Sequence, residues 1–167
     1  WQMRSNPAHS SLGVMMKIWK SKKNTAIDVE KWITALYKEG ELDLTEYKIP
    51  EEKYTWLTYF GEIPVYINID TSEPEIEFII INSVLCEIPL KKEHILPFYR
   101  KCLELNTLFF GASLTINETR VSFFQKRDIE FITEPILGDM IRYQINITEH
   151  VLKELAEEFE IVPSKSE

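Results

Sequence analysis

The sequence predicts an α+β fold, in which an antiparallel sheet built from two hairpin units packs against three helices. Three stretches, near 25–40, 91–109 and 135–160, carry apolar residues at the spacing of an amphipathic helix. Between them lie two groups of short stretches rich in β-branched and aromatic residues, each interrupted by turn residues. Strands joined by hairpins favour an antiparallel sheet with separate helices. The expected element order is therefore α-β-β(-β)-α-β-β(-β)-α.

The first helix has the clearest start and end. Thr25 is a candidate N-cap residue with Asp28 as its capping-box partner, and Gly40 is expected to end the helix. The apolar residues between them share one helical face: Val29, Trp32, Ile33, Leu36 and Tyr37.

The first group of strand-forming residues spans 54–69. Gly61 and Pro64 interrupt it, so we expect either one bent strand or two short ones. The run 70–74 (Asp-Thr-Ser-Glu-Pro) is typical of a turn. Residues 75–88 are then expected to return as an antiparallel strand, which completes the first hairpin unit.

The second helix is expected over about 91–109, with Pro97 in its first turns and Gly111 after its end. Residues 112–117 and 121–131 would form the second hairpin unit. The third helix is expected to begin near Pro135 and to run to about residue 160. The β-branched residues within 145–148 make a break near 144–146 the alternative.

The length of 167 residues indicates one domain, which we expect over 25–162, with 163–167 as a tail. Residues 1–24 have no sustained periodicity and are expected to form a flexible basic arm. The chain begins with Trp1, and a start at Met15 or Met16 would be natural, so two alternatives stay open: residues 1–14 are non-native, or the chain is cut from a longer one.

The charge of the chain is acidic and unevenly placed. There are 27 acidic and 19 basic residues, the first acidic residue is Asp28, and five basic residues precede it. The body of the chain, from residue 28 onward, is therefore strongly negative. A negative charge repels phosphate, so we expect no nucleic acid as a partner. No apolar run is long enough to cross a membrane and no signal peptide is visible, so we expect a cytoplasmic protein without a membrane partner. Contact of the basic arm with the acidic body or with a partner is favoured over contact with an anionic membrane or RNA.

No residue pattern indicates chemistry. Cys86 and Cys102 lie among apolar residues and are expected to be buried free thiols. His9, His94 and His150 lack the spacing of metal ligands. Glycine-rich phosphate-binding motifs are absent, and the many carboxylates fall on turns and polar faces, where solvation explains them. We therefore predict no catalytic, cofactor-binding or metal site, and no enzyme.

Large apolar residues stand next to each other in the expected strands. Consecutive strand residues point to opposite faces of a sheet, so Phe123 and Phe124 would diverge, and Tyr59 and Phe60 likewise. Both faces then need cover, which a homodimer interface, a client protein or the long third helix would provide. The candidate partner-binding residues are Tyr59, Phe60, Tyr66, Phe123 and Phe124.

The second half of the chain carries a recognisable order of local features. A helix ends in 103–106 (Leu-Glu-Leu-Asn), two phenylalanines and a glycine follow at 109–111, and a short strand covers 112–117. After a tight turn, a second strand ends in the charged step 125–128 (Gln-Lys-Arg-Asp), and a long helix closes the segment. In this order the segment resembles the YbjN and type III secretion chaperone-like group. The first helix and first hairpin fit the N-terminal half of that group, so the resemblance covers about 25–160.

The resemblance implies a non-enzymatic, homodimeric, protein-binding module of bacterial type. Its chaperone members hold an unfolded stretch of a client along apolar surface. We therefore expect a chaperone-like protein that binds a protein client or a partner subunit and needs no cofactor. The alternative is a fixed structural subunit of a bacterial defence or secretion assembly, or a toxin-immunity protein. A third hypothesis is an enzyme whose site carries no familiar motif.

Overall fold

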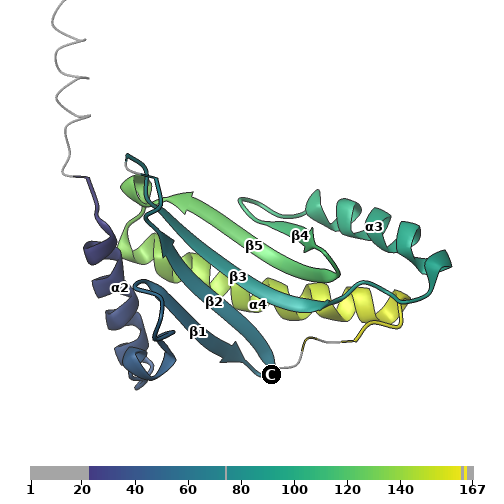
Figure 1. Cartoon of the computed structure of the whole chain (residues 1–167), viewed down its shortest axis with the longest axis horizontal. Helices are drawn as coiled ribbons and strands as arrows, with labels where there is room; N and C mark the ends of the chain where they lie inside the picture. The colour runs from purple at the N-terminus through teal and green to yellow at the C-terminus, as the bar shows by residue number, and fades with distance from the viewer. Residues whose placement is uncertain (1–22, 74, 163, 165–167) are drawn as a thin grey trace, which may run out of the picture.

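The structure is a computed structural model that describes residues 23–73, 75–162 and 164. The expected flexible arm at 1–24 lies almost wholly outside these residues, as does most of the expected tail. The elements are α2 (Ala26–Glu39), η1 (Leu44–Tyr47), β1 (Thr55–Phe60), β2 (Ile63–Asp70), β3 (Phe78–Glu87), α3 (Lys92–Asn106), β4 (Ser113–Asn117), β5 (Arg120–Asp128), η2 (Ile129–Phe131) and α4 (Glu134–Glu158) (Figure 1). The predicted α+β class and element order are confirmed, with three strands in the first unit and two in the second.

The five strands form one antiparallel sheet in the order β1-β2-β3-β5-β4. The stretch 54–69 forms two strands rather than one bent strand, because Gly61, with a positive φ of 60°, makes the turn between β1 and β2. The two hairpin units join where β3 pairs with β5, from Phe78 opposite Asp128 to Glu87 opposite Arg120. The connection from β3 to β4 runs through α3 (Figure 1).

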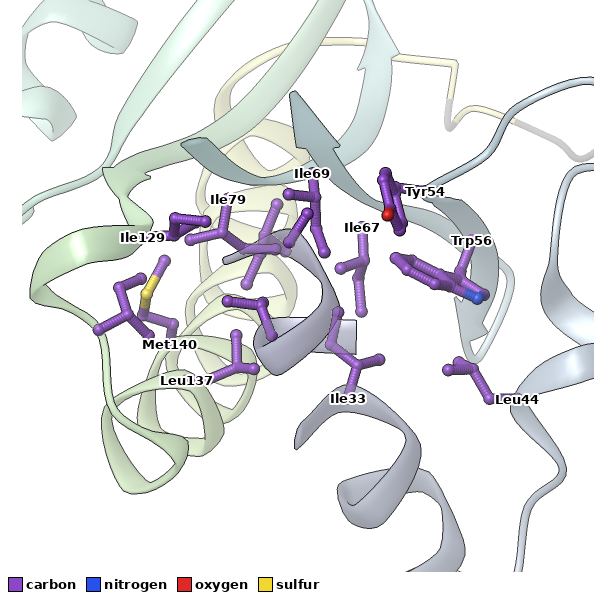
Figure 2. Packing of buried hydrophobic residues seen from close by; sticks show 14 of the residues in the cluster. Ile33, Leu44, Tyr54, Trp56, Ile67, Ile69, Ile79, Ile129, Leu137 and Met140 are labelled. Carbon is purple, nitrogen blue, oxygen red and sulfur yellow. The ribbon is translucent and has the colours of Figure 1, made fainter. Parts of the chain in front are cut away.

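All three described α-helices pack on one face of the sheet. Alternate residues of the central strand β3, such as Ile79 and Ile81, are fully buried on that face. Figure 2 shows Ile33 of α2 and Leu137 and Met140 of α4 around the strand residues of a first apolar cluster. A second cluster lies under α3 and the C-terminal half of α4, and contains Phe98, Cys102, Leu105, Phe123, Val151 and Leu155. α4 contributes to both clusters, so it links the two hairpin units.

The start of α2 matches the sequence prediction. The Thr25 side chain accepts a hydrogen bond from the Asp28 backbone N–H, and the Asp28 carboxylate accepts one from the Thr25 backbone N–H at 3.1 Å. Gly40 is the C-cap residue. Asn24, which precedes the N-cap residue, connects the start of α2 to the segment after β5. Its side-chain amide donates to the carbonyl oxygens of Ile129 (2.9 Å) and Ile132 (2.6 Å).

α4 runs unbroken through the β-branched stretch at 145–148. The low helix propensity of such residues costs only fractions of a kcal/mol each, and burial outweighs it. Gln144 and Thr148, one turn apart, are both fully buried against the sheet. The alternative of a break near 144–146 is therefore wrong.

Gln144 ties the middle of α4 to the centre of the sheet. Its Oε1 accepts a hydrogen bond from Gln125 Nε2 (2.8 Å), and its Nε2 donates to Ser83 Oγ (2.8 Å) and to the Phe123 carbonyl oxygen (2.7 Å). Gln125 Nε2 also donates to the Met140 carbonyl oxygen at 3.0 Å. These polar groups are buried, so they depend on one another for partners.

We predict that Gln144→Leu lowers the free energy of unfolding by about 2–4 kcal/mol. The substitution introduces an apolar side chain of similar size but removes the hydrogen bonds that Gln144 makes to Ser83 Oγ, to the Phe123 carbonyl oxygen and to Gln125 Nε2, which keeps only its bond to the Met140 carbonyl oxygen. Urea denaturation followed by circular dichroism measures the change. Asn146→Leu, at an exposed position of the same helix, is the control and should shift stability by no more than about 0.5 kcal/mol. Equal stability of the two variants would contradict the role given to Gln144.

Candidate protein-binding surfaces

The face of the sheet opposite the helices carries large apolar side chains. No described helix lies over it (Figure 1). Side chains alternate along a strand, so the residues between the buried ones point to this side. We call it the open face and define it by Leu57, Tyr59, Tyr66, Phe78, Ile80, Val84 and Phe124. All but Tyr59 are half-buried, and Tyr59 is 44% exposed.

The middle of the open face is an aromatic pair around an amide. Tyr66, Asn82 and Phe124 lie opposite one another on β2, β3 and β5. The Asn82 Oδ1 atom is buried and has no hydrogen-bond partner in the structure. An unpaired buried acceptor is energetically costly.

The predicted partner-binding residues fall on two different sides of the sheet. Tyr59, Tyr66 and Phe124 lie on the open face. Phe123 has no exposed surface and packs against Phe109, with 5.0 Å between ring centroids, so the expectation that it contacts a partner is corrected: it is a core residue. Phe60 also points to the helical side, where it packs half-buried against the first cluster.

A groove lies on the helical side between the C-terminal half of α2, the middle of α4 and the hairpin of β1 and β2. Its cavity volume is about 340 Å³. The walls are mostly apolar, with Leu36, Phe60, Ile67, Ile141 and Ile145 among them, and Glu39 and Arg142 are its charged residues. A Cβ at Gly138 would lie 3.5 Å from Leu36 Cδ2, an ordinary van der Waals contact, so α2 and α4 lie close together there. We did not predict this groove, because no local pattern shows where two helices diverge.

A row of exposed apolar side chains follows α3 and the loop after it. Leu96 and Leu103 lie seven residues apart on the outer side of α3 and are 76% and 68% exposed. Leu108 and Phe110 continue the row at 72% and 84% exposed. We call these four residues the α3 ridge. They lie away from the buried side of the helix, which is formed by Phe98, Cys102 and Leu105.

Both cysteines are buried and free, as predicted. Burial raises the pKa of the Cys86 thiol to about 12, with smaller effects from nearby Cys102 and Glu87. Burial likewise raises the pKa of the Cys102 thiol to about 11. Both thiols therefore stay protonated at neutral pH, a state with little nucleophilic or metal-binding character.

Within the part of the chain that is described, three or more His, Cys, Asp or Glu side chains nowhere gather as they would to hold a metal ion. Among the same residues, none of the helices has the length and apolar character that crossing a membrane requires.

No protein-family profile matches the sequence, and no curated protein matches it at a significant level. Solved structures do match. The structure of the ExsC–ExsE complex, which contains a type III secretion chaperone, aligns with a TM-score of 0.61 and 11% sequence identity, over 79% of this chain and 96% of that one. YbjN from E. coli, provisionally described as a transcription regulator, aligns with a TM-score of 0.51 and 12% identity, over 84% of this chain and 97% of that one.

The chain has the fold of YbjN and of a type III secretion chaperone. The resemblance noted in the sequence is thus confirmed at the level of the fold. At such low identity the likeness concerns the arrangement of the backbone, so the partner of this chain has to be inferred from its own surface.

We predict that neither native cysteine reacts with a thiol reagent at pH 8 while the protein is folded. Both thiols are buried, and their raised pKa values leave almost no thiolate at that pH. Alkylation by iodoacetamide, read by mass spectrometry, should add nothing to the native protein and two groups in denaturant. Glu149→Cys, on the exposed side of α4, is the positive control and should react within minutes. Reaction of a native cysteine as fast as this control would contradict the prediction.

Proposed function

We propose that this protein is a non-enzymatic, chaperone-like module that binds a segment of another protein on its open face. The observation that carries the proposal is the apolar character of a sheet face that no described helix covers. An antiparallel sheet whose second face meets water normally alternates apolar and polar residues. Here that face holds Leu57, Tyr66, Phe78, Ile80 and Phe124, side chains suited to contact with a partner.

The polar groups of the open face favour a polypeptide as the partner. Asn82, whose buried Oδ1 has no hydrogen-bond partner, lies between Tyr66 and Phe124, and a rotation of its side chain on binding would offer that acceptor to a backbone or side-chain N–H. Aromatic side chains around a central polar contact are typical of the best-binding parts of protein interfaces. A client segment with apolar side chains would bury these rings and satisfy the amide at the same time.

One end of the open face is acidic. Asp70 and Asp128 lie on either side of Phe78 across β2, β3 and β5. Lys126 partly offsets them, with its Nζ 4.0 Å from the centroid of the Phe78 ring and 3.8 Å from Asp70 Oδ2. With a net charge of −8 on the chain, such a rim favours clients that carry basic residues beside apolar ones and disfavours nucleic acid.

The α3 ridge is the surface we assign to a homodimer. Its four apolar side chains are each at least two-thirds exposed and follow one another along α3 and the loop after it, so pairing with a second copy would remove them from water. α3 packs on the helical side of the sheet, so pairing through the ridge leaves the open face available to a client. The buried reduced thiols fit a cytoplasmic location for such a dimer.

We expect Phe124→Asp to abolish capture of a protein partner. A carboxylate in place of the ring cannot be buried against apolar client residues without a large desolvation cost. Affinity capture from native lysate with the full chain, read by quantitative mass spectrometry, compares the wild type with the variant. The matched control is Asn146→Asp, which adds the same charge on the helical side and should capture the partner as the wild type does.

Thermal unfolding of each variant checks that the fold survives, and Tyr66→Asp provides a second substitution on the open face. If both open-face variants retain the partner at wild-type levels, the proposed function is wrong. A partner that never dissociates and keeps a constant stoichiometry would instead favour a fixed subunit of an assembly.

We expect the double substitution Leu96→Glu and Leu103→Glu to convert a homodimer into a monomer. The carboxylates introduced on the two facing ridges would repel one another. Their burial in the interface would also carry a desolvation cost. Light scattering coupled to size-exclusion chromatography gives the mass of the wild type and of the variant. Glu93→Ala, exposed on the same helix but outside the ridge, should leave the mass unchanged. A wild-type mass of one chain would rule out the dimer.

A further inference from the structure

The first described residues of the chain are bonded to the fold beside the acidic end of the open face. The Lys23 ammonium group pairs with the Glu130 carboxylate at 3.1 Å. The side-chain amide of the next residue, Asn24, donates to the Ile129 carbonyl oxygen at 2.9 Å. Both partners belong to η2, which directly follows β5 and its last residue, Asp128, on the open face. The chain therefore enters the fold at the end of the sheet where β5 ends and β3 begins.

The nine residues that precede Lys23 are almost all apolar or basic. We call them the arm segment, and they lie outside the described part of the chain: Val14, Met15, Met16, Lys17, Ile18, Trp19, Lys20, Ser21 and Lys22. No acidic residue occurs in the sequence before Asp28. The arm segment thus combines apolar side chains with positive charge, which is the composition that the open face and its acidic end favour in a client.

The open face and the arm segment carry charge and apolar groups in the same order, counted from Lys23. The acidic end of the face, with Asp70 and Asp128 on either side of Phe78, lies at the end of the sheet where Lys23 is bonded. The apolar part of the face, with Phe124 at its middle, follows further along β3. In the sequence, counted backwards from Lys23, two lysines within 20–22 come first and the apolar residues within 14–19 follow. Opposite charges and apolar groups therefore match along the same direction.

The arm segment is long enough to reach across the open face. Nine residues of extended chain span at most about 30 Å. Along β3 the face runs from Phe78 to Val84, six residue steps that cover about 20 Å. Its side chains on β2 and β5 lie about 5 Å to either side of β3. The segment can therefore span the central part of the face while Lys23 keeps its ion pair with Glu130.

From these observations we propose that the arm segment docks on the open face of its own chain. Its lysines lie at the acidic end, near Asp70 and Asp128. Its apolar side chains, Ile18 and Trp19 among them, lie on the apolar part of the face. The contact removes apolar surface from water on both sides and brings opposite charges together.

The arm segment then acts as an internal competitor of the client. Because it is joined to the fold at Lys23, its effective concentration at the open face is high. A client has to displace it, so docking lowers the affinity of the open face for every client and excludes those that bind weakly. The inference rests on the proposed function in that the surface it covers is the one that we propose for the client.

The test locates the arm segment in the full-length chain by nuclear magnetic resonance. Ser11→Cys, three residues before the segment, carries a nitroxide spin label, which weakens the backbone amide signals of residues close to it. The native cysteines are buried, so they stay unlabelled. We expect strong signal loss at Asn82, Val84 and Phe124 of the open face, and a much smaller loss at Glu149 on the exposed side of α4.

The matched variant is Ile18→Asp with Trp19→Asp in the same labelled chain. It removes apolar contact and adds carboxylates that the acidic end repels, so the signal loss on the open face should fall to the level at Glu149. Ser5→Asp with Ser10→Asp is the control, because it adds the same charge outside the arm segment and should keep the loss on the open face.

Signal loss that is equal on both sides of the sheet, absent from the open face, or unchanged by Ile18→Asp with Trp19→Asp would each overturn the proposal. A mixture of spin-labelled chains with isotope-labelled chains that carry no spin label detects contact between copies. Signal loss in this mixture as strong as within one chain would assign the contact to a second copy, which also overturns it. The experiment needs no client, whereas the capture experiment with Phe124→Asp does, so failure of the proposed function and failure of this inference give different results.

Discussion

The buried contact between Gln144 and the centre of the sheet is the constraint on which the architecture depends. Gln144 bonds Gln125, Ser83 and the Phe123 backbone, so a single side chain of α4 joins β3 to β5 at the seam between the two hairpin units. Such a network is stable only when every member is paired, which sets the position of α4 along the sheet. Apolar contacts alone would tolerate a helix shifted by a turn more easily.

With α4 in this position, all of the described α-helices share one face of the sheet. α2 and α3 pack on either side of the same helix, each over its own apolar cluster. The opposite face is left with half-buried aromatic and aliphatic side chains that no described helix covers. An arrangement of two layers therefore leaves an uncovered apolar face as a direct consequence of its packing, and this is the face that we propose for partner binding.

The surfaces that we propose for partner binding differ in their physical character. The open face is a broad apolar area that contains Asn82, whose Oδ1 has no hydrogen-bond partner, whereas the α3 ridge consists of exposed aliphatic and aromatic side chains. Because they lie on different parts of the fold, a dimer contact and a client contact need not exclude one another. Structures with the same fold at 11–12% identity retain the backbone arrangement while these side chains are free to change.

The sequence by itself determined the elements and their order, because caps, turns and apolar periodicity act between neighbouring residues. The capping box of Thr25 and Asp28 is of this kind, whereas the sequence left open whether 54–69 forms one bent strand or two strands with a turn at Gly61. Alternation along β5 also showed that Phe123 and Phe124 point to opposite sides, but not which side the helices would cover. Only the tertiary structure decided that Phe123 is core and Phe124 lies on the open face, that the α3 ridge points outward, and that Ser164 reaches Leu85. Each of these depends on contacts between segments far apart in the chain, which local periodicity does not encode.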